Sequence, residues 1–198
     1  MIVPGRTILA RQILTNLRSP AIQRQPCGVD LTLKRILRWT SPGAIDFDNS
    51  RRESTKTEEI PFTPPSSNSA PHKRPAAPIT TSSFSPFLAA VTSSDDTTPA
   101  SISLAQGAYL VEFNEFISVP LNVMGQLFVR SSLFRSGALL SAGVMDSGYE
   151  GAIGGLLQVV NPTGLPLYRD ARLRQMVFHE MAEKVEGYNG VYQGRSSI

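Results

Sequence analysis

The chain has 198 residues, of which 41% are hydrophobic, and a formal net charge of +3 at pH 7. This length allows one domain with a sizeable core, and the dispersed Lys and Arg residues suit an acidic small ligand better than a nucleic-acid face. The single cysteine, Cys27, excludes a disulfide within the chain, and no apolar run reaches the roughly 20 residues that a membrane-spanning helix needs.

The first 49 residues predict a helix followed by a strand. Within residues 7–18 (TILARQILTNLR), apolar side chains recur at helical spacing, and Thr7 is a candidate cap. No acidic residue precedes Asp30, and this lack of acidic residues is also typical of a mitochondrial transit peptide. An amphipathic helix at the start of the domain is the favoured interpretation. Residues 28–39 (GVDLTLKRILRW) alternate apolar and polar side chains, which predicts a half-buried strand.

Composition changes sharply in the middle of the chain. Residues 50–102 are first charged and then dominated by Pro, Ser and Thr. Such a segment buries too little apolar surface to offset its ordering entropy, so we predict a disordered insertion. Its HKR triplet at 72–74 is either a weak nuclear signal or solvated charge. The predicted domain is thus split into residues 1–49 and 103–198, and cytoplasmic or nuclear location is favoured over mitochondrial.

Short strands follow the insertion. They are expected at residues 107–113, 125–129, 138–145, 151–161, 165–168 and 172–181, with a helical turn beginning at Ser131. Strands of this length separated by Gly and Pro are typical of an all-β sandwich or barrel.

Four features of this region carry candidate chemistry. Arg130, Ser131 and Ser132 follow a strand and offer hydroxyls and a guanidinium for a phosphate, or simply a helix cap. Asp146 precedes a Gly-containing turn, where a carboxylate either orients a water or closes the turn. Tyr149 either stacks on a sugar or packs on the core. The Gly- and Tyr-rich end, residues 187–198, is either a lid or a frayed tail.

In their order along the chain, these motifs resemble the trimeric dUTPase and dCTP deaminase superfamily. The resemblance covers residues 1–48 and 104–195. It rests on MIVPGRTIL at the start, QPCGVDLTL (25–33), VRSSLFRSG (129–137), AGVMDSGYEG (142–151), RLRQMVF (172–178) and YNGVYQG (188–194). The start and the tail are similar to the deaminase-type branch, whereas SAGVMD before the turn is similar to the dUTPases.

The resemblance implies a distorted jelly-roll-like β-barrel that forms a homotrimer with active sites between subunits and binds Mg²⁺ across a nucleoside triphosphate. Asp30 would meet the metal through water. Arg130, Ser131 and Ser132 would contact the phosphates, and Arg135 matches an arginine that lines the phosphates and the site. Gln175 matches the fourth-motif glutamine and is a further substrate-binding candidate.

For the nucleoside, the resemblance implies a different set of contacts. Asp146 would act on the attacking water and the sugar 3′-hydroxyl, and Tyr149 would pack against the deoxyribose. The pyrimidine would be read by main chain near Gly143, Val144 and residues 153–158. No direct nucleic-acid or membrane partner is implied.

Departures from the family pattern separate the alternatives. Deaminases place a proton-shuttling glutamate where this chain has Gln158, and an amide cannot shuttle a proton as a carboxylate does. The segment is also two residues longer than expected. These features favour a dUTP diphosphatase, which limits uracil in DNA, over a dCTP deaminase or a bifunctional enzyme, for which Glu150 is the nearby candidate carboxylate.

The tail departs further. Val191 replaces a lysine that precedes the second tyrosine in the deaminase-type branch. Arg195 is a candidate replacement for the lost positive charge. Both Arg195 and Tyr188 are candidate substrate contacts. Arg174 occupies a place where a small residue is common. The glycine-rich fifth motif of dUTPases is absent from the sequence. A catalytically weak nucleotide-binding relative, with the insertion as a docking segment, therefore remains a third hypothesis.

Overall fold

The computed structural model describes residues 1–64 and 99–198, and residues 65–98 lie outside the described part. The N-terminal elements are β1 (Ile2–Val3), α1 (Gly5–Ala10), β2 (Leu14–Thr15), α2 (Pro20–Gln23), β3 (Arg24–Gln25), β4 (Gly28–Trp39) and β5 (Thr57–Ile60). Those after the gap are β6 (Ser101–Leu104), β7 (Gly107–Ser118), β8 (Val123–Val129), α3 (Ser131–Arg135), β9 (Ala138–Ser141), β10 (Glu150–Val159), β11 (Leu165–Tyr168) and β12 (Arg172–Glu180).

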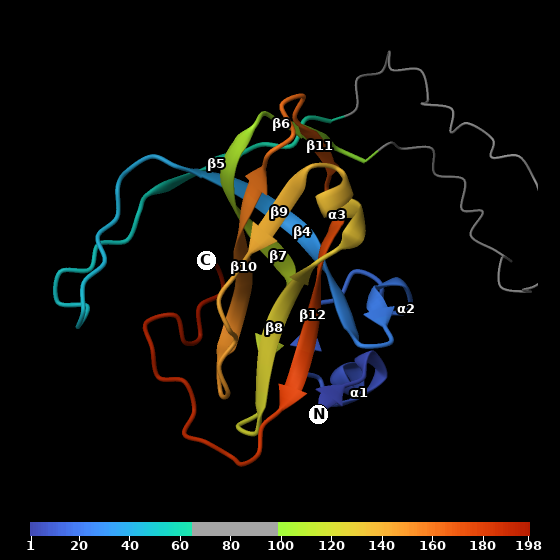
Figure 1. Cartoon of the computed structure of the whole chain (residues 1–198), viewed down its shortest axis with the longest axis vertical. Helices are drawn as coiled ribbons and strands as arrows, with labels where there is room; N and C mark the ends of the chain where they lie inside the picture. Colours follow the sequence, from blue (N-terminus) through green and yellow to red (C-terminus); the bar gives the residue numbers. More distant parts are fainter. Residues whose placement is uncertain (65–98) are drawn as a thin grey trace, which may run out of the picture.

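The strands form one curled antiparallel sheet and a separate β6–β11 pair. The main path runs β1–β12–β4–β7–β10–β9, with β8 on β12, β3 and β5 on β4, and β2 on β7. Figure 1 shows this sheet curling around a tall body, with α1 and α2 near its lower end and α3 near its upper end. The all-β, barrel-like prediction is confirmed. No helix in the described residues is both long and apolar enough to cross a membrane.

Strand β4 joins the two halves of the sheet. Its first half pairs with β12, and its second half pairs with β7. Val29, Leu31 and Leu33 are fully buried in the core, as the alternation predicted. However, Asp30 and Thr32 on the other face are buried as well, at 2% and 3% exposure, so the prediction of a half-buried strand is wrong here. Their polar groups are satisfied by partners distant in sequence, which strand periodicity cannot reveal.

The predicted helix over residues 7–18 is wrong beyond its first half. Helix α1 ends at Ala10, and the cap position is Pro4 rather than Thr7. Gln12 and Asn16 then adopt left-handed backbone angles, with φ of 54° and 58°. Between them, Leu14 pairs with Ile117 of β7. Pairing with the sheet outweighs the helical spacing of the apolar residues.

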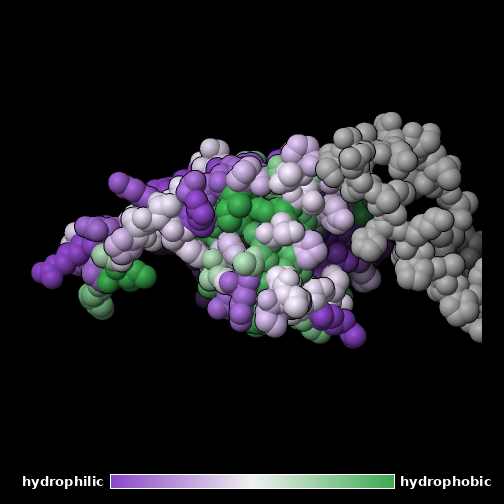
Figure 2. Space-filling model, turned by 90° about the horizontal axis from the view of Figure 1, so that it is seen from above, coloured by the Kyte–Doolittle hydropathy of each residue, from purple (hydrophilic) through white to green (hydrophobic). Residues whose placement is uncertain are grey.

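Both ends of the predicted insertion belong to the folded body. Strand β5 pairs with β4, where Ile60 lies opposite Ile36, and Ser101 begins β6. Between β4 and β5, residues 40–56 form a projecting hairpin, which we call the arm, closed by hydrogen bonds between Ala44 and Glu53. Apolar surface is visible on the arm, at the left of Figure 2.

Candidate functional site

Asp146 lies on the loop that joins β9 to β10. Met145, just before it, exchanges two backbone hydrogen bonds with Gly125 of β8, both 2.9 Å long. The loop then turns, as Tyr149 N–H donates to the Asp146 carbonyl at 3.1 Å, with Gly148 in a left-handed conformation (φ 79°). These contacts fix the backbone on both sides of the Asp146 carboxylate, which is itself exposed.

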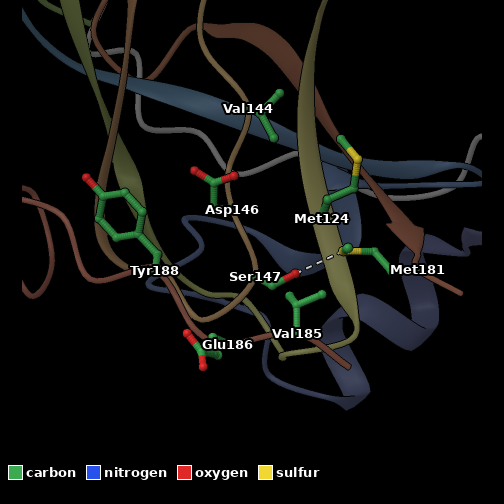
Figure 3. Close-up of a pocket in the computed structure, with 8 residues that line it drawn as sticks. All are labelled: Met124, Val144, Asp146, Ser147, Met181, Val185, Glu186 and Tyr188. Atoms are coloured by element: carbon green, nitrogen blue, oxygen red, sulfur yellow. Dashed lines mark hydrogen bonds between the residues drawn. The ribbon is translucent and has the colours of Figure 1, made fainter. Parts of the chain in front are cut away.

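A cavity of about 310 Å³ opens beside this carboxylate. It is lined by Met124, Val144, Asp146, Ser147, Met181, Val185, Glu186 and Tyr188. In Figure 3 the Asp146 carboxylate projects from its loop, with Val144 above it and Tyr188 beside it. The buried Ser147 hydroxyl donates to the Val123 carbonyl at 2.7 Å, so it serves to anchor the loop.

Tyr149, predicted as a sugar contact, packs against Tyr188, which was predicted as a substrate contact and lines this cavity. Tyr149 and Tyr188 pack edge to face, with ring centroids 5.5 Å apart. The Tyr149 hydroxyl donates to the Ala152 carbonyl at 2.8 Å. Burial raises the pKa of Tyr149, and the neighbouring Tyr188 raises it further by a smaller amount. The positive charge of Arg195 opposes this shift. Tyr149 therefore stays a neutral hydroxyl in the physiological range, and its half-buried ring packs against the hydrophobic core.

The C-terminal tail closes against the Asp146 loop in the same chain. Tyr188 N–H donates to the Ser147 carbonyl at 2.8 Å. Further along, the Gln193 side chain donates to the Gly148 carbonyl at 2.9 Å, and Ala152 N–H donates to the Arg195 carbonyl at 2.9 Å. The tail is thus docked rather than frayed. The Arg195 guanidinium lies over the Tyr192 ring, 5.4 Å from its centroid.

A second group of predicted residues gathers around Asp30 on β4. Its Oδ2 atom lies 3.3 Å from Arg130 Nε, 3.1 Å from Arg172 Nη1 and 3.3 Å from Gln25 Nε2. Gln175 of β12 lies directly opposite Asp30 in the β4–β12 register. Burial raises the pKa of the Asp30 carboxyl, and the two guanidinium groups oppose that shift without cancelling it.

The remaining phosphate-binding candidates extend from this group along α3. Ser131 and Ser132 open the helix directly after Arg130, and both are exposed. Arg135 ends the helix, with its guanidinium 5.9 Å from the Phe134 ring centroid. The exposed hydroxyls and the cations at the surface of the Asp30 group form an arrangement that suits a phosphate chain.

The two groups are separated within one chain. Strand β8 contacts the Asp146 loop at Gly125 and leads to Arg130 five residues later. At the rise of an extended strand, this places the two positions roughly 16 Å apart. A single chain therefore presents the Asp146 carboxylate and the cations predicted to bind phosphate on different parts of its surface.

Some predicted residues lie outside both groups, and some contributors were missed. Gln158 is exposed near the far end of β10, paired with Ala108 and Leu139. Gly143 lies in open surroundings, where a Cβ added to the glycine would meet no atom within 4 Å. Among the missed residues, Arg172 holds Asp30, and Glu186 adds a second carboxylate to the Asp146 cavity. Arg172 opens the RLRQMVF motif, but its pairing with Asp30 depends on the return of β12 to β4, and no local motif marks Glu186.

Comparisons with known proteins agree with this architecture. Residues 2–181 match the family model described as dCTP deaminase-like. The chain is 33% identical over 186 residues to a probable deoxyuridine 5′-triphosphate nucleotidohydrolase of Methanosarcina mazei, covering 93% of this chain and 89% of that protein. It is 32% identical over 195 residues to the deoxyuridine 5′-triphosphate nucleotidohydrolase of Methanocaldococcus jannaschii, covering 98% and 100%.

A solved structure matches the fold at lower identity. The 2′-deoxycytidine 5′-triphosphate deaminase from Agrobacterium tumefaciens superposes with a TM-score of 0.55 at 16% identity. The match covers 89% of this chain, which spans about half (48%) of the length of that structure. The family-model match and these relatives together show that the chain belongs to the dCTP deaminase-like family of the dUTPase and dCTP deaminase superfamily.

Proposed function

We propose that this protein is a dUTP diphosphatase, which converts dUTP and water to dUMP and pyrophosphate. One observation carries the proposal: the exposed Asp146 carboxylate faces a cavity, while the position that deaminases give to a proton-shuttling glutamate is the amide Gln158. A carboxylate can activate water, whereas an amide cannot carry a proton to and from a pyrimidine. The archaeal relatives named as deoxyuridine 5′-triphosphate nucleotidohydrolases support this choice.

In the proposed reaction, Asp146 accepts a hydrogen bond from the attacking water and takes its proton. The water oxygen bonds to the α-phosphorus as the bond from that phosphorus to the bridging oxygen breaks, which releases pyrophosphate. Positioning and charge stabilisation dominate such reactions. Backbone contacts on both sides of Asp146 hold its carboxylate at the cavity, and Glu186 and Tyr188 of the tail line the same cavity.

The Asp30 group could bind Mg²⁺ indirectly, through a water molecule on the metal. All three contacts of the carboxylate in the described residues go to Oδ2, so Oδ1 is available to accept from a metal-bound water. The described residues contain no cluster of three acidic, His or Cys side chains that would hold a metal alone. Mg²⁺ characteristically binds one or two carboxylates and substrate phosphates, and it would neutralise triphosphate charge here.

We further propose that the active site is completed between the subunits of a homotrimer. Arg130, Ser131, Ser132, Arg135 and Gln175 of one chain would bind the triphosphate. Asp146, Tyr149 and Tyr188 of a neighbouring chain would meet the sugar and the attacked phosphorus, and Arg195 would add positive charge. The separation of roughly 16 Å between the two groups within one chain supports this arrangement.

A second candidate function is a deaminase or bifunctional activity on dCTP. Glu186 favours it, because this residue supplies a second carboxylate at the same cavity. Glu150 is less suitable, since it is exposed and its Oε1 accepts a hydrogen bond from Ser118 at 2.9 Å. A carboxylate close to the base could relay protons during water attack at C4.

Product analysis separates these functions. The purified protein is incubated with Mg²⁺ and either dUTP or dCTP, and the nucleotides are resolved by anion exchange. We expect dUMP from dUTP and no change in dCTP. If uracil nucleotides form from dCTP, and Glu186→Gln abolishes that conversion, the deaminase function takes precedence. If neither substrate changes while dUTP still binds, the protein is a nucleotide-binding relative.

The role of Asp146 has its own test. Asp146→Asn keeps the size of the side chain but removes the base, so kcat for dUTP is expected to fall at least about 100-fold. Binding of a non-hydrolysable dUTP analogue should persist, because the phosphate contacts lie elsewhere. Glu186→Gln is the matched control at the same cavity and should retain dUTP hydrolysis. Near-normal turnover by Asp146→Asn would contradict the assignment.

A further inference from the structure

The arm and the C-terminal tail are far apart in sequence but touch in the fold. Arg52, on the arm, donates through Nη2 to the Tyr192 hydroxyl. The Arg52 guanidinium carbon also lies 4.9 Å from the centroid of the Tyr192 ring. Figure 1 shows both segments on the left of the barrel, the arm in cyan and the tail in red. A hydrogen bond and a cation–π contact between the same two side chains form a specific clasp.

Hydrogen bonds within the arm fix the position of Arg52. Thr40 N–H donates to the Lys56 carbonyl at 2.9 Å at its base, and Ala44 and Glu53 pair farther out. Near the turn, the Asp46 carboxylate accepts from the backbone N–H of Arg51. These bonds hold Arg52 at a defined position on one strand of the arm. Arg51 beside it is exposed and has no side-chain partner in the described residues.

The clasped tyrosine leads directly into the candidate site. After Tyr192, the Gln193 side chain bridges Gly148 and Glu150. Gly194 N–H then donates to the Glu150 carbonyl at 2.9 Å, and Ala152 N–H donates to the Arg195 carbonyl at 2.9 Å. The tail thus makes two backbone hydrogen bonds to the start of β10, a few residues after Asp146. Fixing Tyr192 therefore restrains the whole segment that covers the Asp146 loop.

Arg195 also lies over the Tyr192 ring, so the ring contacts two cations. Its guanidinium carbon lies 5.4 Å from the Tyr192 centroid. Two cations on one ring repel each other, so an incoming polyphosphate would draw Arg195 away more readily than Arg52, which is also hydrogen-bonded. Arg52 would then keep the tail in place while Arg195 turns to the phosphates.

We infer that Arg52 is a positioning residue that holds the C-terminal tail closed over the Asp146 cavity by clasping Tyr192, and thereby sets nucleotide affinity without touching the nucleotide. The kinetic part of this inference rests on the proposed function. The structural part, a tail held by the arm, stands independently of which nucleotide the site takes.

The experiment compares Arg52→Ala with Arg51→Ala in the full chain, by amide hydrogen exchange without nucleotide. The amides of Gly194 and Ala152, which join the tail to β10, should exchange about tenfold faster in Arg52→Ala, given the usual strengths of a cation–π contact and a hydrogen bond. Arg51→Ala should match the wild type, as should exchange of β4 and β12 core amides in both variants. Unchanged tail exchange in Arg52→Ala overturns the inference, even if the protein does not hydrolyse dUTP.

Steady-state kinetics then test the functional part. In Arg52→Ala, KM for dUTP should rise about twofold to tenfold with kcat within twofold of wild type, because the variant loses a pre-closed tail rather than a reacting group. Arg52→Lys keeps a cation near the ring and should recover part of the KM. A fall in kcat with unchanged KM would contradict a positioning role. If the wild-type protein does not hydrolyse dUTP, the proposed function is contradicted. The hydrogen-exchange result then decides alone whether Arg52 holds the tail.

Discussion

At the residue scale, ion pairing in the interior is uneven. Asp30 is buried between two arginines, and Glu112 is fully buried between Lys34 and Arg35. Arg174 is different: it is 4% exposed, and within the described residues neither its Nε nor its Nη1 has a hydrogen-bond partner. It pairs in register with Leu31 and Val129, on the face of the sheet that forms the core. Burial lowers the pKa of Arg174 to about 10.

This environment predicts that Arg174→Met stabilises the fold. Removing an unpaired buried charge while keeping an unbranched stem should raise the free energy of unfolding by about 1–3 kcal/mol. Denaturant unfolding of the full chain measures the change. Arg6→Met, at an exposed arginine without an ion pair in the described residues, is the control and should have little effect. A destabilised Arg174→Met variant would mean that the assembled protein supplies a partner for this guanidinium.

At the element scale, the turn after Asp146 and the tail are fitted to each other. Gly148 has a φ of 79°, and a Cβ at this position would lie 2.6 Å from Gly187 Cα. The turn therefore requires glycine for two reasons, namely its own backbone conformation and the close approach of the tail. Gly143, five residues earlier on the same loop, has no such constraint.

Gly148→Ala should therefore lower the free energy of unfolding by about 1–2 kcal/mol, since alanine resists positive φ and its methyl group displaces the tail. Gly143→Ala provides the matched control and should leave stability within about 0.5 kcal/mol of wild type. Chemical denaturation of both variants tests this expectation. Equal stability of the two variants would show that the tail does not press against the turn in solution.

At the scale of the whole molecule, the outer face of the sheet carries apolar side chains. Leu37, Leu110 and Leu156 lie opposite one another on β4, β7 and β10, where Leu37 is buried and the other two are half-buried. Trp39 and Leu139 extend this row and are 38% and 46% exposed. Large apolar side chains in a continuous row on a sheet face are typical of an interface between subunits. This face is our candidate for trimer contact.

Leu139→Lys should weaken the proposed trimer, because it places a charge within the proposed apolar contact. Sedimentation velocity at micromolar concentration should shift from trimer toward monomer, with dUTP hydrolysis lost in parallel if the site spans two chains. Tyr168→Lys replaces a similarly exposed apolar side chain on β11, which belongs to the separate sheet, and should sediment as wild type. A wild-type protein that is monomeric would contradict both the interface and the shared site.

Local sequence determined a large part of this protein. Alternating apolar residues specified β4, and Gly- and Pro-bounded runs specified β7, β8, β10, β11 and β12, because strand periodicity depends on near neighbours. The order of motifs specified the family, and it identified Asp146, Arg130 and Asp30 as the residues to place.

Tertiary structure decided what depends on long-range contact. It ended α1 at Ala10, because Leu14 pairs with β7. It paired Asp30 with Arg172 and brought Glu186 to the Asp146 cavity. It also joined Arg52 to Tyr192 across 140 residues of sequence. Such contacts depend on which segments the folded sheet brings together in space, and no periodicity along the chain encodes that.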